Sequence, residues 1–307
     1  MTKFAYFRGE IIPLAEAKLG IMNNTLNYGT GVFEGMRAYW NDRDEQMYIF
    51  RMREHYERLA KSCRIMMLNL PMSVPELCDL TVEVVRRNEP REDTYIRPLA
   101  YKESDLVRLR LDDIPDGFFI YTTPFGKYLP QEQGIRCTIS TWRRLDDNAL
   151  PARAKVVGAY ANSALIKSQA ALDGYDEAIV LTHDGHVSEG SSENVFLVTG
   201  GKLVTPTVTD NILVGITRNT IIELAREELG IDVVERQIGR TELYTADEAF
   251  LTGSAAEVTP VGEIEHRKVG DGNPGPVTMR LQELYLRAVR GQLERHQDWI
   301  TPVYPRG

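Results

Sequence analysis

Lys155 stands where a lysine could act as a covalent nucleophile. Among the nine lysines, it alone is followed by small and apolar residues, VVGA at 156–159, that lead into a predicted helix. Partial removal from water disfavours the charged form of an amine and leaves the neutral nucleophile. Such an amine can form a Schiff base with a carbonyl compound. The competing interpretation is a surface lysine whose methylene chain covers apolar neighbours.

A carboxylate with glycine and serine neighbours lies between two predicted strands. The segment reads SEGSSEN over 188–194, with Glu189 as its second residue. A carboxylate that is removed from water needs a partner, and a protonated ring nitrogen would serve as one. An exposed polar loop is the alternative interpretation of the same residues.

Two turns could bind a phosphate through their backbone N–H groups. The first, GITR at 215–218, opens a predicted helix over 217–229, and Thr217 stands where an N-cap residue belongs. The second, TGSAAE at 252–257, follows a predicted strand and could form an anion-binding concavity. Unsatisfied N–H groups at a helix start attract phosphate. Taken singly, each segment is equally well explained as an ordinary capped helix or a tight turn.

Together these groups match what pyridoxal 5′-phosphate requires of a protein. A lysine amine holds the aldehyde, a carboxylate keeps the pyridine nitrogen protonated, and N–H groups with an arginine hold the phosphate. The combination therefore predicts a pyridoxal-phosphate site.

Interleaved strands and helices must position these residues. Hydrophobic spacing and turn residues predict strands at 3–7, 10–13, 31–39, 46–50, 94–101, 117–122, 135–142, 201–205 and 248–251, and a strand–turn–strand region over 177–198. Arg8 and Gly9 are expected to join the first two strands as a hairpin. The same signals predict helices at 51–63, 73–88, 158–172 and 217–229, the second of them opened by a capping box of Ser73 and Glu76, and further strand and helix within 231–238 and 276–292. This alternation predicts an α/β or α+β protein of two domains. The segment 124–134, rich in proline and glycine, is the expected linker between domains at 1–123 and 135–307.

Composition excludes several classes of function. The 307 residues are 43% hydrophobic and carry a formal charge of −8, which argues against nucleic acid or an anionic membrane as a partner. We expect no membrane span and no secretory signal. Three widely spaced cysteines without a C-x-x-C pair favour the cytoplasm and argue against a disulfide or metal site. His183 and His186 flank a predicted turn and are expected to be exposed rather than metal ligands.

The motifs resemble those of the fold-type IV pyridoxal-phosphate enzymes, and within them the bacterial branched-chain-amino-acid aminotransferases. The resemblance runs from about residue 4 to residue 277. It rests on YGTGVFEG at 28–35, YIRPL at 95–99, Lys155 with Tyr160, SEGSSEN at 188–194, GITR at 215–218 and TGSAAE at 252–257.

This resemblance implies a fold, an activity and a set of roles. It implies a small N-terminal α/β domain, a larger C-terminal pseudo-barrel domain that binds the cofactor, and a cytoplasmic homodimer or higher homo-oligomer in branched-chain amino-acid biosynthesis. The implied reaction moves the amino group of L-Leu, L-Ile or L-Val to 2-oxoglutarate, giving 2-oxo acids and L-glutamate. Lys155 would be the catalytic Schiff-base lysine. The other cofactor-binding residues would be Arg58, Tyr160, Glu189, Leu213, Ile216, Thr217 and Ser254. The substrate-binding residues would be Tyr28, Phe33, Arg37, Tyr95, Arg97, Ser254 and Ala255.

The sequence also departs from the family pattern. Gly31 and Ser254 replace a usual serine and threonine, and KVVGAY at 155–160 differs from the K-x-G-x-N-Y of many relatives. The loop at 104–113 lacks the common glycines and carries Arg108 and Arg110, so we expect a broader donor range that includes (R)-configured primary amines. A D-amino-acid aminotransferase or an aminodeoxychorismate lyase of the same fold is the alternative enzyme. A non-catalytic cofactor-binding protein is the alternative outside enzymes.

Overall fold

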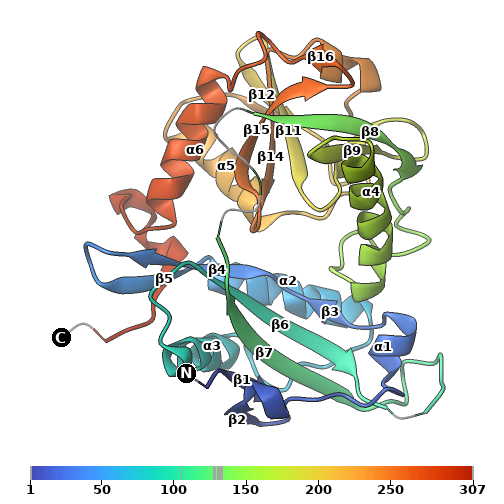
Figure 1. Ribbon diagram of the computed structural model, residues 1–307, viewed down its shortest axis with the longest axis vertical. Coiled ribbons are helices and arrows are strands. Elements are labelled where there is room, and N and C mark those ends of the chain that lie inside the picture. Colours follow the sequence, from blue (N-terminus) through green and yellow to red (C-terminus); the bar gives the residue numbers. More distant parts are fainter. Residues whose placement is uncertain (1, 105, 127–128, 130–133, 306–307) are drawn as a thin grey trace. The chain divides into compact units, whose positions relative to one another are not determined.

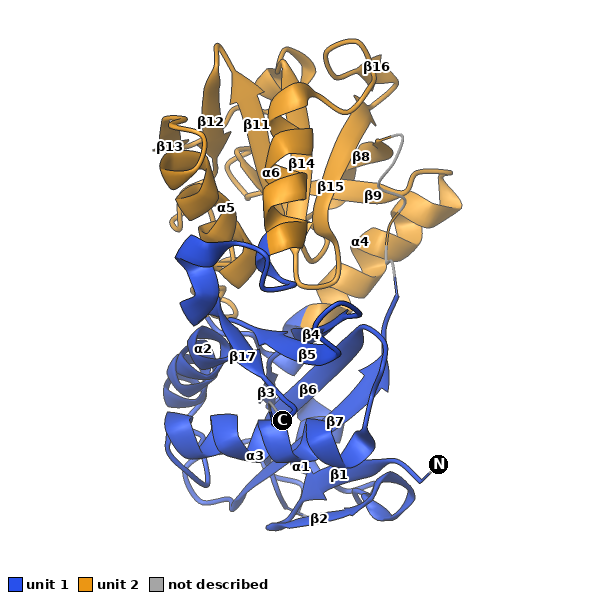
Figure 2. Cartoon of the chain, turned by 90° about the vertical axis from the view of Figure 1, so that its left-hand side faces the viewer, with its two compact units in different colours: residues 1–126, 154–159, 288–307 blue, residues 127–153, 160–287 orange. Residues whose placement is uncertain are grey.

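The computed structural model describes residues 2–104, 106–126, 129 and 134–305 (Figure 1). Contacts divide the chain into two compact units (Figure 2). Unit 1 comprises Met1–Gly126, Ala154–Ala159 and Ala288–Gly307, and unit 2 comprises Lys127–Arg153 and Tyr160–Arg287. The domain boundaries expected from the sequence stay a prediction, and residues 127–128 and 130–133 of the expected linker lie outside the described residues.

Unit 1 is built on an eight-stranded sheet. Its strands are β1 (Phe4–Phe7), β2 (Glu10–Pro13), β3 (Val32–Phe33), β4 (Met36–Asn41), β5 (Gln46–Phe50), β6 (Thr94–Lys102), β7 (Asp116–Pro124) and β17 (Ile300–Pro302). They follow the order β17-β5-β4-β6-β7-β1-β2, and β3 pairs with β6. Arg8 and Gly9 join β1 to β2 with φ angles of 50° and 96°, as a two-residue hairpin turn requires. The predicted first hairpin is therefore confirmed.

The strand predicted over 31–39 is interrupted, so this prediction was wrong in extent. The chain leaves the strand conformation at Glu34 and Gly35, between β3 and β4. A Cβ atom at Gly35 would overlap the Tyr95 hydroxyl, which explains why glycine stands there. The break turns the Glu34 side chain into the interior of the unit, where it is fully buried.

Helices complete unit 1. They are η1 (Leu14–Glu16), α1 (Asn24–Tyr28), α2 (Met52–Ile65), α3 (Val74–Asn88), η2 (Val157–Ala159) and η4 (Glu294–Trp299). Ser73 and Glu76 form the capping box that the sequence predicts at the start of α3. The inward face of α2 carries His55, Leu59 and Ser62, which are all buried.

Unit 2 is built on a nine-stranded sheet that nearly closes on itself. Its strands are β8 (Ile135–Arg143), β9 (Glu177–Leu181), β10 (Val187–Gly190), β11 (Asn194–Thr199), β12 (Lys202–Thr205), β13 (Val233–Glu235), β14 (Glu248–Gly253), β15 (Glu257–Ile264) and β16 (Arg267–Lys268). The order is β10-β9-β8-β15-β14-β11-β12-β13, with β16 on β15. Beyond β13, Val187 donates to the Ile238 carbonyl at 2.9 Å and His186 bridges Gly239, so the two edges meet. This closure matches the pseudo-barrel that the family resemblance implies.

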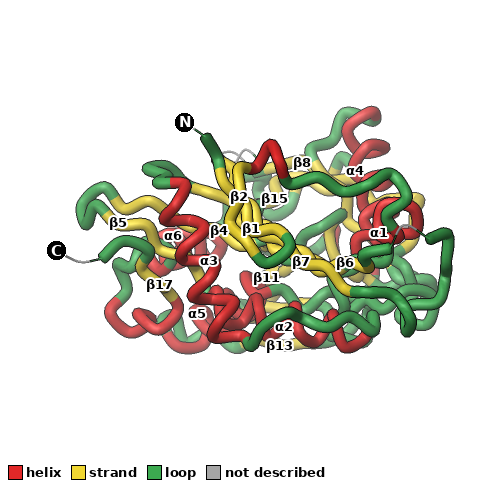
Figure 3. The backbone as a smooth tube through the Cα atoms, turned by 90° about the horizontal axis from the view of Figure 1, so that it is seen from below, coloured by secondary structure: helices red, strands yellow, loops and turns green. Residues whose placement is uncertain are grey.

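The helices of unit 2 cover this barrel. They are α4 (Tyr160–Leu172), α5 (Ile216–Glu227), η3 (Arg240–Tyr244) and α6 (Pro276–Ala288), whose last residue belongs to unit 1. Buried residues of α4, Ile166 and Ala170, pack on Ala178 and Val180 of β9. The Gln282 side chain of α6 donates to the Val258 carbonyl of β15. Helices and strands thus alternate along the chain as the sequence predicts, and the α/β fold class is confirmed (Figure 3).

Candidate active site

Lys155 is anchored through its backbone within unit 1. Its carbonyl accepts the Phe33 N–H at 3.1 Å, and its own N–H donates to the Ser62 hydroxyl at 3.2 Å. The residue is half-buried, and its Nζ lies 5.1 Å from the centroid of the Phe33 ring. An aromatic face attracts a cation and also provides an apolar wall. The structure therefore places this amine beside an apolar side chain, as its sequence context predicts.

Two glycines allow the segment that carries Lys155 to lie against the YGTG segment. Gly158 donates to the Gly29 carbonyl at 3.0 Å, and a Cβ atom at Gly29 would lie 2.7 Å from the Gly158 Cα. Gly29 also ends α1 with a φ of 69°, a conformation that favours glycine. Tyr28, expected in the substrate pocket, precedes this turn and is 37% exposed.

Four of the predicted substrate residues lie together in unit 1. The Arg97 guanidinium donates to the Tyr95 hydroxyl at 2.7 Å and lies 4.2 Å from the Phe33 ring centroid. Arg37 faces Tyr95 across the β4–β6 pair. The Arg37 guanidinium is buried, pairs with Asp93 at 3.5 Å, and donates to the Phe125 carbonyl at 3.1 Å. Arg97 is the more accessible of the two guanidinium groups.

A buried cluster holds Arg58 in place. Both carboxylate oxygens of Glu34 accept from the Arg58 guanidinium at 2.7 Å, and His55 Nδ1 lies 2.7 Å from Glu34 Oε2. Burial would raise the pKa of Glu34, but the charge of Arg58 and the bonds from Arg58 and His55 outweigh it and hold this pKa well below its ordinary value. Burial also lowers the pKa of His55, and the bond to Glu34 offsets only part of that effect. The cluster is thus an ionised Glu34–Arg58 pair with a neutral histidine beside it.

Glu189 lies on β10 in unit 2, where it is buried among donors. The Arg144 guanidinium pairs with its carboxylate at 2.9 Å, and the Leu213 N–H donates at 3.0 Å. The Asn194 amide lies 3.4 Å from the same carboxylate and donates to the Leu213 carbonyl at 2.9 Å. The exposed-loop interpretation of this segment is therefore wrong, because Glu189 is only 4% exposed. The structure brings Glu189 and Leu213, both predicted cofactor residues, into direct contact.

Asn194 also reaches the first turn of α5. Gly215 is the N-cap residue, and a Cβ atom there would overlap the Asn194 Oδ1. The predicted N-cap at Thr217 is therefore wrong, because Thr217 is the second residue of the helix. A glycine cap lets the Asn194 side chain pack closely against the backbone, which a threonine cap would prevent. Ile216 and Thr217 are buried within the first turn. The first intrahelical hydrogen bond runs from the Asn219 N–H to the Gly215 carbonyl, so the N–H groups of Ile216 and Thr217 have no acceptor within the helix.

The TGSAAE turn lies at the same end of the sheet. Thr252 of β14 pairs with Asn194 of β11, so the turn that contains Ser254 and Ala255 begins beside Asn194. The Thr252 hydroxyl is fully buried and has no hydrogen-bond partner within the described residues. Tyr160, another predicted cofactor residue, is half-buried at the start of α4.

A second buried acid follows Glu189 on the same segment. Glu193 is 3% exposed, and its carboxylate accepts only from the N–H and hydroxyl of Ser192 among the hydrogen bonds of the described residues. Burial, reinforced by the negative charge of Glu177, raises the pKa of Glu193 to about 7. Lys167 pairs with Glu177 at 2.7 Å. Glu193 therefore keeps its proton to a higher pH than an ordinary glutamate.

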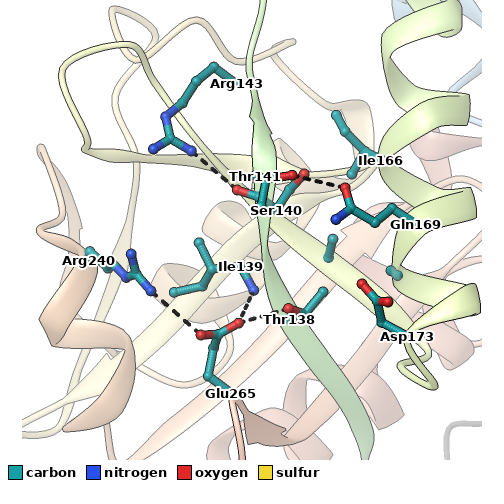
Figure 4. A pocket seen from close by; sticks show the side chains of 12 residues that line it. Thr138, Ile139, Ser140, Thr141, Arg143, Ile166, Gln169, Asp173, Arg240 and Glu265 are labelled. Carbon is teal, nitrogen blue, oxygen red and sulfur yellow. Dashed lines mark hydrogen bonds and ion pairs between the residues drawn. The ribbon is translucent and has the colours of Figure 1, made fainter.

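A cavity of about 330 Å³ opens between β8 and α4 in unit 2 (Figure 4). Three of its charged groups are engaged locally: Arg240 pairs with Glu265 at 3.5 Å, and Arg143 donates to the Ser140 carbonyl at 3.2 Å. Its twelve lining residues include none of those predicted to bind cofactor or substrate. The described residues include no group of three or more acids, histidines and cysteines that could hold a metal ion. Within the same described ranges, every helix is too short or too polar to cross a membrane.

Sequence reasoning missed three residues that hold the predicted ones. Glu34 holds Arg58, Arg144 holds Glu189, and Asn194 links Glu189 to α5. Glu34 and Asn194 lie inside the motifs that carry the family resemblance, which was an available signal. Arg144 follows another arginine after a predicted strand and reads as an exposed loop residue.

Comparison with known proteins identifies the family. The family described as "Amino-transferase class IV" matches residues 31–264. A probable branched-chain-amino-acid aminotransferase of Aquifex aeolicus (strain VF5) is 52% identical over 303 residues, which cover 99% of this chain and 97% of that protein. The structure of a branched-chain aminotransferase from Thermoproteus uzoniensis with norvaline is 44% identical, with a TM-score of 0.95 and coverage of 99% of this chain and 100% of that one. The structure of a T.th. branched-chain amino acid aminotransferase complexed with N-(5′-phosphopyridoxyl)-L-glutamate is 40% identical, with a TM-score of 0.92 and 99% coverage of both chains.

The chain therefore belongs to the class IV aminotransferases, which are pyridoxal-phosphate-dependent enzymes of fold type IV. Within that family it groups with the branched-chain-amino-acid aminotransferases. The family resemblance and the cofactor predicted from the sequence are thus confirmed.

Proposed function

We propose that this enzyme transfers the amino group of L-Leu, L-Ile or L-Val to 2-oxoglutarate, giving the branched-chain 2-oxo acids and L-glutamate. The observation that carries the proposal is the placement of Lys155 and Arg97 about one aromatic ring, that of Phe33. The ring offers an apolar wall to an aliphatic side chain, whereas the guanidinium can pair with the distal carboxylate of glutamate. The relatives crystallised with norvaline and with a phosphopyridoxyl-L-glutamate adduct support both halves of this reaction.

The residues present fit pyridoxal phosphate. They supply a half-buried amine, a buried carboxylate, an arginine and a glycine-capped helix start. The proposed cofactor residues are Arg58, Lys155, Tyr160, Glu189, Leu213, Ile216, Thr217 and Ser254. When bound, the cofactor supplies an aldehyde that condenses with amines and a ring that accepts electrons.

Each of these side chains has a proposed task. Lys155 would hold the cofactor through Nζ and, when an amino donor takes its place, would move a proton at the substrate Cα; positioned proton transfer contributes roughly 10²–10⁴-fold in rate. Glu189 would accept a hydrogen bond from the protonated ring nitrogen, and Leu213 would pack on the ring. Tyr160 would form a hydrogen bond with the ring hydroxyl. Arg58, Ser254 and the N–H groups at the start of α5 would bind the phosphate.

The proposed substrate residues are Tyr28, Phe33, Arg37, Tyr95, Arg97, Ser254 and Ala255. Arg97 is favoured over Arg37 as the partner of the glutamate carboxylate, because the Arg37 guanidinium is buried and already pairs with Asp93. The N–H groups of Ser254 and Ala255 would bind the α-carboxylate that the amino-acid and 2-oxo-acid substrates share.

A homodimer and a secondary activity on (R)-configured primary amines complete the proposal. Ile21, Leu26, Val107 and Leu109 are each at least 68% exposed, and Asn24 joins their two segments by donating to the Arg108 carbonyl at 2.6 Å. Exposed large apolar side chains that lie together are typical of an interface, and a second copy is the proposed occupant.

The proposed domains remain 1–123 and 135–307, and the proposed location is the cytoplasm, which suits three free thiols.

Spectroscopy and trapping test the function. The purified protein with pyridoxal phosphate should be yellow, should bleach toward the near-ultraviolet with L-leucine, and should recover with 2-oxoglutarate. Borohydride reduction followed by peptide mapping should locate the pyridoxyl group on Lys155. Lys155→Ala should abolish turnover, whereas Lys61→Ala, which alters an exposed lysine of the same unit, should not.

A donor panel distinguishes the related reactions. L-leucine, D-alanine and an (R)-configured primary amine should be compared as amino donors, with 2-oxoglutarate as the acceptor. Aminodeoxychorismate should be assayed in parallel for cleavage without an acceptor. The comparisons do not favour the D-amino-acid or lyase alternatives. A preference for D-alanine, an active Lys155→Ala variant or a spectrum unchanged by every donor would contradict the proposal.

A further inference from the structure

One face of α2 carries three polar side chains that reach other segments of unit 1. His55, Arg58 and Ser62 stand at helical spacings of three and four residues and therefore lie along one side of the helix. His55 and Arg58 contact Glu34, whereas Ser62 contacts the backbone of the segment that contains Lys155. One helix thus carries Arg58 and contacts the backbone of Lys155, two residues that the proposed function assigns to the cofactor.

The contact to Arg58 fixes the orientation of its guanidinium. Nε donates to one oxygen of Glu34 and Nη2 donates to the other, so the plane and the direction of the group are both determined. His55 and the Glu34 backbone, which donates to the Pro98 carbonyl at 2.9 Å, hold the carboxylate in turn. Glu34 is fully buried, so water does not compete for these bonds.

The contact to Lys155 fixes its backbone. The Ser62 hydroxyl accepts the Lys155 N–H, and the Lys155 carbonyl accepts the Phe33 N–H from the other side. Ser62 is fully buried. The Cα of Lys155 is therefore held between α2 and β3, and the side chain beyond it is the part that can move.

We propose that Glu34 and Ser62 are positioning residues, which set the span between Arg58 and Lys155 through α2. This inference rests on the roles proposed above, with Arg58 on the phosphate and Lys155 on the aldehyde. Glu34 acts through Arg58 and hence only on ligands that carry a phosphate. Ser62 acts through Lys155 and hence on every ligand that carries the aldehyde.

Pyridoxal phosphate and pyridoxal, which lacks the phosphate, separate these two actions. The full chain is freed of cofactor by dialysis and titrated with each ligand, and binding is followed by absorbance and protein fluorescence. Glu34→Gln should weaken pyridoxal-phosphate binding roughly tenfold to a hundredfold, the range expected for a charged hydrogen bond, and should change pyridoxal binding less than twofold. Glu34→Asp keeps the charge and should fall between wild type and Glu34→Gln. Ser62→Ala should weaken both ligands by the same factor, about two- to tenfold.

One variant controls for a general loss of stability. Glu248→Gln alters a buried carboxylate of unit 2 that accepts from Val277 and Thr278. It should lower the denaturation midpoint while leaving the ratio of the two ligand affinities unchanged. If Glu34 had a merely structural role, Glu34→Gln would likewise leave the ratio of the two ligand affinities unchanged.

The outcomes are distinct. If wild type binds neither ligand, the proposed function is wrong, and this inference falls with it. If wild type binds both, but Glu34→Gln and Glu34→Asp weaken both ligands equally or neither, Glu34 does not act through the phosphate. If Glu34→Gln does not fold, Glu34→Asp and Ser62→Ala carry the test, and a selective effect of Ser62→Ala on one ligand would overturn its assignment to Lys155.

Discussion

The close contact between Gly215 and Asn194 leads to a quantitative prediction. Gly215 has a φ of −69° and a ψ of 138°, which alanine adopts without strain. Most of the effect of Gly215→Ala should therefore come from the overlap between its Cβ and the Asn194 side chain, with a smaller part from the Arg218 Cβ, which would lie 3.2 Å away. Overpacking a buried site costs about 1–3 kcal/mol, so the free energy of unfolding should fall by that amount. The first turn of α5 should also shift, and pyridoxal-phosphate affinity should fall with it.

Removing the obstructing side chain should rescue the variant. Asn194→Ala alone loses hydrogen bonds to Leu213 and Glu189, at about 0.5–1.5 kcal/mol each. In the double variant with Gly215→Ala, the new methyl group occupies space that the amide has vacated. The two losses should therefore sum to more than the loss of the double variant, by about 1–2 kcal/mol.

Urea denaturation followed by circular dichroism, at a fixed pyridoxal-phosphate concentration, measures all three variants. Gly239→Ala is the matched control, because Gly239 is also an N-cap glycine, with φ −74° and ψ 146°. A Cβ atom there would lie 3.6 Å from Glu242, which is ordinary contact. A neutral Gly215→Ala, or losses for Gly215 and Asn194 that add within about 0.5 kcal/mol, would refute the reasoning.

Two further predictions concern stability. Burial and the charge of Glu177 raise the folded-state pKa of Glu193 from 4.5 to about 7, so the free energy of unfolding should decrease by about 3 kcal/mol as the pH rises from about 4.5 to about 7. Urea denaturation at pH 5 and pH 8 measures this decrease, and Glu193→Gln should lose it. An equal decrease in wild type and Glu193→Gln would contradict the prediction. Gly29→Ala should lower the free energy of unfolding by at least about 1 kcal/mol more than Gly9→Ala, because both glycines have positive φ but only at Gly29 would a Cβ meet the Gly158 backbone. Urea denaturation measures both variants, and equal losses would show that the contact with Gly158 is unimportant.

The sequence predicts the local features of this fold well because their causes are local. The Arg8-Gly9 turn and the Ser73 capping box depend on residues within four positions of each other. The need for glycine at position 35, where the strand breaks, was not predictable in this way. It follows from the Tyr95 hydroxyl, which the chain brings close only after β4 and β6 have paired.

The same distinction applies to the candidate site. Residue type and turn chemistry single out Lys155 and Glu189, and the family resemblance adds the remaining roles. The Thr217 cap was wrong because hydroxyl side chains are preferred at helix starts, whereas here the packing of Asn194 requires glycine.

Partners distant in sequence decide what the chemically interesting residues can do. A glutamate such as Glu189 costs free energy when buried alone, and pairing with Arg144 offsets part of that cost. Glu34 does the same for Arg58 in the other unit. Neither pairing can be read from the neighbouring residues in the sequence, because each bond forms only when the sheet has folded. A buried ion pair at Arg58 and at Glu189 therefore indicates that the fold determines the orientation of these two proposed cofactor residues before any ligand binds.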